Sequence, residues 1–124
     1  MHAIVLHEGF LDGLFKAIDT MDATQFGSFI AEDGEFRFAS APVVRGRDAI
    51  IAAVDGFFGT IDGLAHSVTR VWRDGESLAC EGEVCYRRKD GNDVIIPFVD
   101  VFEFSGELIS SYRIYIDISP LYAE

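Results

Sequence analysis

The second half of the chain is divided by three short glycine-centred segments, and their spacing constrains the fold more than any other feature. The segments are Asp74-Gly75, Asp90-Gly91 and Ser105-Gly106. An Asp-Gly pair between β-rich runs is a strong hairpin signal, because glycine tolerates the positive φ that tight turns require. We therefore predict a four-stranded antiparallel meander. Its strands cover about residues 64–73, 76–89, 92–104 and 107–118, which are rich in Val, Ile, Phe and Tyr.

The first half of the chain shows helical spacing of its apolar residues instead. Asp22 has the side chain of a helix N-cap, and Gly59 is placed to end a later helix. The Glu32-Asp33-Gly34 segment is typical of a turn. The predicted elements are helices over 8–20, 23–30 and 46–58, with short strands over 35–38 and 43–45. Helices followed by a long meander predict an α+β domain with helices on one side of a curved sheet.

Composition narrows the class of partner. The 124 residues suit a single domain, 1–124, and 49% apolar residues with 11 Phe supply a core. A net charge of −11 argues against nucleic acid and anionic membrane partners, because both are bound through Lys and Arg. Cys80 and Cys85 are placed on opposite faces of one strand and cannot pair. Two thiols without a disulfide framework predict a cytoplasmic protein.

The turns also predict which side chains share a face of the sheet. If each turn is a two-residue loop, His66 lies opposite Glu83, and Phe98 lies opposite both Glu83 and Arg113. One face then mixes charged and aromatic residues, which suits an apolar pocket with a few polar groups. The other face is nearly all aliphatic, which suits burial against helices or a second subunit. The mixed face holds His66, Val68, Arg70, Trp72, Glu81, Glu83, Cys85, Phe98, Asp100, Phe102, Ser111, Arg113, Tyr115 and Asp117.

Two segments carry a resemblance to a known family. They are Val44-Arg45-Gly46-Arg47-Asp48-Ala49-Ile50 and the ending from Gly106 to Asp117. With the order of the helices, they resemble the SnoaL-like branch of the nuclear transport factor 2-like superfamily over essentially the whole chain. The resemblance implies a cone of three helices wrapped by a strongly curved antiparallel sheet, with a pocket inside, and a homodimer. The superfamily includes steroid delta-isomerases, limonene-type epoxide hydrolases, polyketide cyclases, dehydratases and non-enzymatic members, so the fold transfers better than the function.

Compared residue by residue, the steroid isomerase pattern is only partly present. The segment from Pro97 to Phe104 resembles the pattern Pro-x-Asp-x-Phe-x-Phe with one extra residue, and places Asp100 as the acid kept protonated toward an enolate. The isomerase base falls on Phe38, and its helix tyrosine falls on Leu14. Two of three groups are therefore missing, which argues against that mechanism.

The other two enzyme patterns meet at the last strand. The terminal acid of limonene-type epoxide hydrolases matches Asp117, and their second carboxylate falls on Glu83. Their bridging arginine falls on Glu81, and their Tyr and Asn fall on Phe36 and Phe38. SnoaL-type polyketide cyclases match only at Asp117, where the acid removes a carbon-bound proton. The resemblance supports the position of a pocket and no single reaction.

We infer a small-molecule pocket with Asp117, Asp100 and His66 as candidate catalytic residues. The candidate substrate-binding residues are Tyr115, Arg113, Glu83, Phe38, Phe98, Phe102 and Trp72. Each polar candidate also has a structural interpretation. Asp117 would be solvated at a frayed strand end, Asp100 would pair with Arg113, and His66 would be a satisfied structural histidine rather than a dyad with Glu83.

The leading functional hypothesis is an acid/base enzyme without a cofactor that acts on an apolar or aromatic carbonyl compound. Asp117 would remove a proton, Asp100 or Tyr115 would stabilise the oxyanion, and Arg113 and His66 would tune the acids. Metal-ligand motifs are missing from the sequence. The alternatives are a non-catalytic module that binds a hydrophobic ligand, and an interaction subunit that assembles through the aliphatic sheet face. For the enzyme or the module, we expect a homodimer through the sheet.

Overall fold

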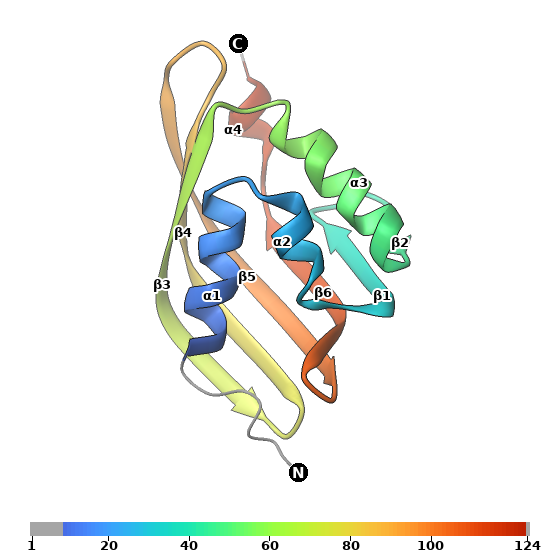
Figure 1. The fold of residues 1–124 in the computed structure, drawn as a ribbon. Coiled ribbons are helices and arrows are strands. Elements are labelled where there is room, and N and C mark those ends of the chain that lie inside the picture. Colours follow the sequence, from blue (N-terminus) through green and yellow to red (C-terminus); the bar gives the residue numbers. More distant parts are fainter. Residues whose placement is uncertain (1–8, 124) are drawn as a thin grey trace.

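A computed structural model describes residues 9–123, in which six strands form one curved sheet with the helices on its concave side (Figure 1). The strand order is β2-β1-β6-β5-β4-β3, and β1 runs parallel to β6 while the other neighbours are antiparallel. In chain order the elements are α1 (Gly9–Asp19), α2 (Ala23–Gly27), β1 (Ile30–Phe38), β2 (Val44–Arg45), α3 (Arg47–Phe58), β3 (Gly63–Asp74), β4 (Ser77–Arg87), β5 (Asp93–Ser105), β6 (Leu108–Ile116) and α4 (Ser119–Tyr122). The predicted α+β class and the four-stranded meander are confirmed.

The elements of the first half follow local signals with two exceptions. The Asp22 side chain accepts a hydrogen bond from the Gln25 backbone N–H at 3.0 Å, as predicted for an N-cap, and Gly59 follows the end of α3. The prediction of a helix through residue 30 was wrong, because β1 already begins at Ile30 and pairs with β6. The expected turn at Gly34 lies inside β1. A Cβ there would lie 2.8 Å from Ile30 Cγ2, so glycine allows the irregular strand to approach its neighbours.

The predicted register of the meander was wrong, and this changes which side chains share a face. The β3–β4 loop begins one residue later than expected, since Asp74 pairs with Ser77, and a bulge between Val68 and Arg70 shifts the pairing again. The β4–β5 connection is longer than two residues, because Arg87 pairs with Asp93. Another bulge lies at Ser110 in β6, because Glu103 pairs with Ser111 and the next residue, Phe104, pairs with Ile109. A shift by one residue turns a side chain to the opposite face.

The correction exchanges parts of the two predicted faces. On β5, Phe98, Asp100 and Phe102 point inward as expected, but the aliphatic residues of β4 and β6 share that concave face. Cys80, Asp100 and Ile114 form one row across three strands. The concave core is therefore mostly aliphatic and aromatic, with Asp100 at its centre. Cys80 is buried and Cys85 is half-buried, and both thiols are free as predicted.

Gly82 fixes how closely β3 and β4 approach at the bulge. A Cβ at this position would lie 1.9 Å from the Ser67 carbonyl oxygen, which is backbone and cannot swing away. We expect Gly82→Ala to lower the free energy of unfolding by about 1–3 kcal/mol, as overpacking typically does. Urea denaturation measures the change. Gly56→Ala is the matched control, because a Cβ there meets nothing within 4 Å. Equal stability of the two variants would contradict the close approach.

The convex face is partly apolar and largely open to solvent. Ile95 is 65% exposed and Tyr115 is 53% exposed, and Val99 and Val101 are half-buried. The aliphatic residues here come from β5, whereas those of β4 and β6 point to the concave side. The aliphatic surface is therefore smaller than the sequence predicted. The homodimer through the sheet stays a prediction. Within residues 9–123, every helix is too short or too polar to cross a membrane.

Candidate functional site

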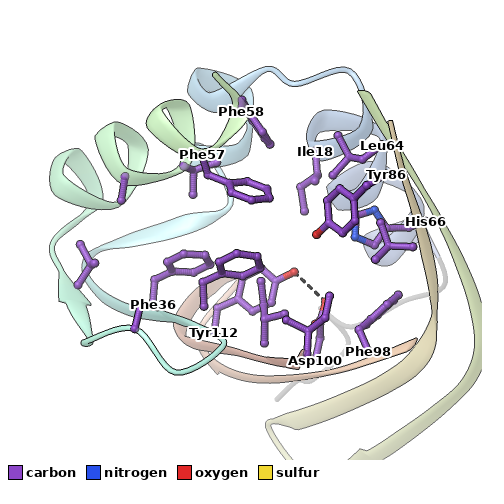
Figure 2. A pocket seen from close by; sticks show the side chains of 18 of the residues that line it. Ile18, Phe36, Phe57, Phe58, Leu64, His66, Tyr86, Phe98, Asp100 and Tyr112 are labelled. Atoms are coloured by element: carbon purple, nitrogen blue, oxygen red, sulfur yellow. Dashed lines mark hydrogen bonds between the residues drawn. The ribbon is translucent and has the colours of Figure 1, made fainter. Parts of the chain in front are cut away.

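A cavity of about 200 Å³ lies between the concave face and the helices (Figure 2). Strands β1, β3, β4, β5 and β6 supply its floor and one wall, and α3 supplies the other wall. Its lining is apolar apart from His66, Tyr86, Asp100 and Tyr112, and within residues 9–123 it includes neither Lys nor Arg. The full lining is Ile18, Phe36, Phe38, Ala41, Pro42, Val44, Ala53, Val54, Phe57, Phe58, Leu64, His66, Val84, Tyr86, Phe98, Asp100, Tyr112, Ile114 and Ile116.

Asp100 lies at the floor of this cavity and is 1% exposed. The Tyr112 hydroxyl donates a hydrogen bond to Asp100 Oδ2 at 2.8 Å, which is the dashed line in Figure 2. The other carboxyl oxygen, Oδ1, is buried and has no hydrogen-bond partner in the part of the chain that the structure describes. Buried polar atoms are almost always paired, and an unpaired one costs about 1–3 kcal/mol. Oδ1 is therefore the polar group of this cavity that a ligand could satisfy with a hydrogen bond.

Burial makes Asp100 a weak acid. Desolvation raises the pKa of Asp100 to about 7, although the hydrogen bond from Tyr112 acts in the opposite direction. The same burial raises the pKa of Tyr112 and Tyr86 well above the ordinary tyrosine value and that of Cys80 to about 12, so these neighbours stay neutral. Near neutral pH the Asp100 carboxyl thus exists in both forms, as a donor when protonated and as an unbalanced charge when ionised.

His66 borders the cavity from β3 and is held by Asp19 at the end of α1. The imidazole Nδ1 lies 2.6 Å from Asp19 Oδ1, and the His66 backbone N–H donates to Asp19 Oδ2 at 2.9 Å. The ring stacks on Phe15 with centroids 4.5 Å apart and meets the edge of Phe98 at 5.2 Å. The predicted partner Glu83 was wrong, because Glu83 pairs with Ser67 and faces away.

Only some of the predicted site residues meet at the cavity. Asp100, His66, Phe38 and Phe98 line it. Phe102 is fully buried in the core, beside Phe104 and Tyr112 and outside the lining. The remaining predicted substrate-binding residues, Tyr115, Arg113, Glu83 and Trp72, also lie outside the lining.

Partners for these outlying side chains lie on the outer side of the sheet. Trp72 is 43% exposed, and its ring receives the Arg70 guanidinium at 5.0 Å. Arg113 contacts Ser111 and Glu103 instead of Asp100, so the expected ion pair with Asp100 was wrong. The register correction explains both results, because it turns these β3 and β6 side chains outward.

Asp117 lies just beyond β6, exposed and outside the cavity lining. One carboxyl oxygen accepts hydrogen bonds from the Ser119 backbone N–H at 3.0 Å and from its hydroxyl at 2.6 Å. These bonds lower the pKa of Asp117 below the ordinary value, which is the opposite of what a buried base needs. The surroundings of Asp117 therefore agree with its structural interpretation as a solvated acid at the end of the strand.

Three residues of the site escaped prediction from the sequence. Tyr86 and Tyr112 are not among the residues predicted for the mixed face and so belong to the predicted aliphatic face. On β4 and β6 that face points into the cavity. The alternation of Tyr112 with Ile114 and Ile116 is the signal that could have found it. Asp19 carries no local signal, since it becomes a partner of His66 only when α1 packs on β3. Among residues 9–123, no group of three or more His, Cys, Asp or Glu side chains is arranged to hold a metal ion.

Comparisons with known proteins agree on the fold. A family described as the SnoaL-like domain matches residues 11–112. A protein from Catenulispora acidiphila with a ketosteroid isomerase-like fold, solved in complex with trimethylamine, has a TM-score of 0.82 and 19% identity, covering 90% of this chain and 87% of its own. An NTF2-like protein of unknown function from Burkholderia pseudomallei has a TM-score of 0.81 and 15% identity, with 90% of each chain covered.

An enzyme is also among the similar structures. An LEH-like epoxide hydrolase from M. tuberculosis has a TM-score of 0.75 and 17% identity, covering 90% of this chain and 83% of its own. Comparison with curated proteins finds no match to the sequence. At these identities the structural likenesses establish the architecture, and the chemistry has to be argued from the cavity itself.

Proposed function

Because the chain belongs to the SnoaL-like family of the NTF2-like superfamily, whose fold encloses a pocket, we propose that it is an acid/base enzyme acting on a small apolar carbonyl compound. The observation that carries this proposal is the buried, unpartnered Oδ1 of Asp100 in an otherwise apolar cavity of the described chain. A protonated Oδ1 donates a hydrogen bond to a carbonyl oxygen, which satisfies both groups without placing a charge in the cavity.

In the proposed reaction, His66 removes a proton from the substrate, and Asp100 stabilises the oxygen on which the negative charge develops. His66 Nε2 accepts the proton from the carbon next to the carbonyl, and the electron pair of that C–H bond forms an enolate. The Asp100 Oδ1–H donates to the enolate oxygen, while the Tyr112 hydroxyl holds the carboxyl in place through Oδ2. The proton then returns from Nε2 to a carbon of the enolate. A positioned base contributes roughly 10² to 10⁴ in rate.

The size of the cavity limits the substrate. An engineered cavity of about 150 Å³ in another protein holds benzene. About 200 Å³ therefore suits one six-membered ring with a carbonyl and a short substituent, and is too small for a four-ring steroid. Within residues 9–123, the lining offers no cation to a carboxylate or phosphate group, which favours an uncharged compound.

Hydrogen exchange in D₂O tests this proposal without knowledge of the natural substrate. We expect the protein to accelerate exchange of the protons next to the carbonyl of 2-cyclohexen-1-one, followed by ¹H NMR. His66→Gln should slow the exchange roughly a hundredfold, because the base is lost, and Asp100→Leu should slow it similarly, because the oxyanion loses its donor.

Asp117→Asn provides the control for this experiment. Its carboxylate is exposed and outside the cavity, so exchange should continue at the wild-type rate. Loss of exchange in Asp117→Asn with no loss in His66→Gln would reverse the assignment of the base. A wild-type protein that binds the ketone without exchanging its protons would reduce the proposal to a binding function.

A second candidate function is binding of a small alkylammonium ion. The ionised Asp100 would supply the counter-charge, and aromatic rings of Phe36, Phe57, Tyr86 and Tyr112 line the same cavity. Aromatic faces attract such cations. The trimethylamine complex of the similar Catenulispora acidiphila protein adds support. The two candidates require opposite protonation states of Asp100, which makes them separable by experiment.

A further inference from the structure

Asp19 stands where a carboxylate is electrostatically unfavourable. It is the last residue of α1, and the carbonyl ends of a helix repel negative charge and favour Lys or Arg. The side chain of Asp19 is 26% exposed, and both of its oxygens are engaged by one residue, His66. Thr20 already satisfies the end of the helix, since its hydroxyl donates to the Lys16 and Ala17 carbonyls. The Asp19 carboxylate therefore interacts with His66 and does not stabilise the end of the helix.

The geometry around His66 leaves the imidazole a single orientation. The backbone N–H of His66 occupies Asp19 Oδ2, so Oδ1 faces Nδ1 at 2.6 Å. Phe15 stacks on one face of the ring, Phe98 meets it edge-on, and the side chain is 10% exposed. A flip of the ring would place a C–H group against the carboxylate and lose the hydrogen bond. Nε2 is then the ring nitrogen left for the cavity that His66 borders (Figure 2).

We propose that Asp19 is a positioning residue that fixes the proton of neutral His66 on Nδ1 and so presents the unprotonated Nε2 to the substrate. An ionised carboxylate only accepts hydrogen bonds, so Nδ1 must carry the proton. A free histidine side chain prefers the other tautomer, with the proton on Nε2. In that tautomer Nε2 cannot accept a proton from the substrate. When Nε2 takes a proton from the substrate, the adjacent Asp19 carboxylate stabilises the imidazolium.

This inference rests on the proposed function for its catalytic part, but the tautomer is measurable without a substrate. The ¹⁵N chemical shifts of a neutral imidazole distinguish a protonated ring nitrogen from a bare one. In the wild-type protein at pH 8, the His66 signals should show a protonated Nδ1 and a bare Nε2. Comparison with His66→Gln identifies these signals among those of the other histidines.

Asp19→Asn reverses the pattern with almost no change in shape. Its single amide oxygen accepts from the His66 backbone N–H, and its NH₂ group then donates to Nδ1, which moves the ring proton to Nε2. We expect the reversed ¹⁵N pattern and a loss of roughly a hundredfold or more in kcat for proton exchange of 2-cyclohexen-1-one. KM should change little, because Asp19 does not line the cavity.

Two further variants separate positioning from simple packing. Asp12→Asn alters another carboxylate of α1, which with Asp19 borders a second cleft between α1 and β3, and should leave both tautomer and rate unchanged. Asp19→Glu keeps an accepting carboxylate and should retain a protonated Nδ1, with part of the rate. A wild-type His66 protonated on Nε2 would overturn the inference. So would a reversed tautomer in Asp19→Asn with an unchanged exchange rate.

The readouts also separate this inference from the proposed function. A wild-type protein with Nδ1 protonated but no exchange activity would contradict the enzyme proposal and leave the positioning role of Asp19 standing. An active protein whose His66 tautomer is the same with and without the Asp19 carboxylate would support the enzyme proposal and contradict the positioning role.

Discussion

Replacing Asp100 by asparagine is expected to raise the free energy of unfolding by about 4 kcal/mol at pH 8 and by almost nothing at pH 4. Burial raises the pKa of Asp100 from 3.8 to about 7 in the folded protein. Between these pH values the unfolded chain has released the proton and the folded chain still holds it. Stability therefore falls as pH rises through this window, at about 1.36 kcal/mol per pH unit, and stays low above pH 7.

Asparagine imitates the protonated carboxyl at every pH. Its amide oxygen accepts the Tyr112 hydrogen bond, and its NH₂ group takes the place of the protonated Oδ1. Urea denaturation of both proteins from pH 4 to pH 8 measures the difference, in which the contributions of other carboxylates largely cancel.

Asp117→Asn is the control of opposite sign. The pKa of Asp117 is lowered by Ser119, so its contribution is present at neutral pH and lost as pH falls below the ordinary aspartate value. Its amide variant should be slightly less stable than the wild type at pH 8. An Asp100→Asn protein that is also less stable at pH 8 would identify Asp100 as a structural group. An Asp100→Asn protein that is more stable at pH 8 would show that the Asp100 carboxyl lowers the stability of the fold, as groups in functional sites often do.

The affinity for a neutral ketone should fall about tenfold for each pH unit above 7, while the affinity for tetramethylammonium should rise toward pH 7 and then level off. The ketone needs the protonated Oδ1 as a donor, whereas the cation needs the ionised carboxylate. Isothermal titration with 2-cyclohexen-1-one and with tetramethylammonium chloride, from pH 5 to pH 9, measures both curves. Tetramethylammonium carries a permanent charge, so its own titration does not enter.

Asp100→Asn separates the contribution of Asp100 from that of His66. Of the other ionisable groups lining the cavity, Tyr86 and Tyr112 stay neutral over this range because burial raises their pKa. The pH dependence that the variant loses therefore belongs to Asp100. Binding of the ketone alone, with the predicted fall, supports the enzyme proposal. Binding of the cation alone, with the predicted rise, replaces it by the alkylammonium function.

Local patterns predicted the elements better than their pairing. The N-cap at Asp22, the end of α3 at Gly59 and the four meander strands each depend on a few neighbouring residues, which a sequence displays directly. The strand β1 was placed too late because its first residue, Ile30, pairs in parallel with Ile109 from the far end of the chain. Such pairing leaves no trace in the local sequence.

The candidate site was predicted where it depends on local sequence and missed where it depends on pairing between distant segments. Asp100 and Phe98 were assigned to the inner face because alternation along β5 is local, and the motif around Asp100 is contiguous. Cross-strand register placed Glu83, Arg113 and Asp117 on the same face, and two bulges and one longer connection displaced that register. The partnership of Asp19 with His66 joins a helix end to a strand 47 residues away, and depends on tertiary packing alone.

The bulge between Val68 and Arg70 also insulates the cavity from changes in chain length. On the α3 side of the bulge, the pairing from Gly63 to Val68 positions His66, while on the other side the β3 residues from Arg70 to Asp74 are exposed. An insertion or deletion at the tip of the hairpin can be absorbed where the strands are already out of step. The β3–β4 hairpin is therefore the place where relatives or engineered variants can differ in length, or carry a fused peptide, while His66 keeps its place beside Asp19.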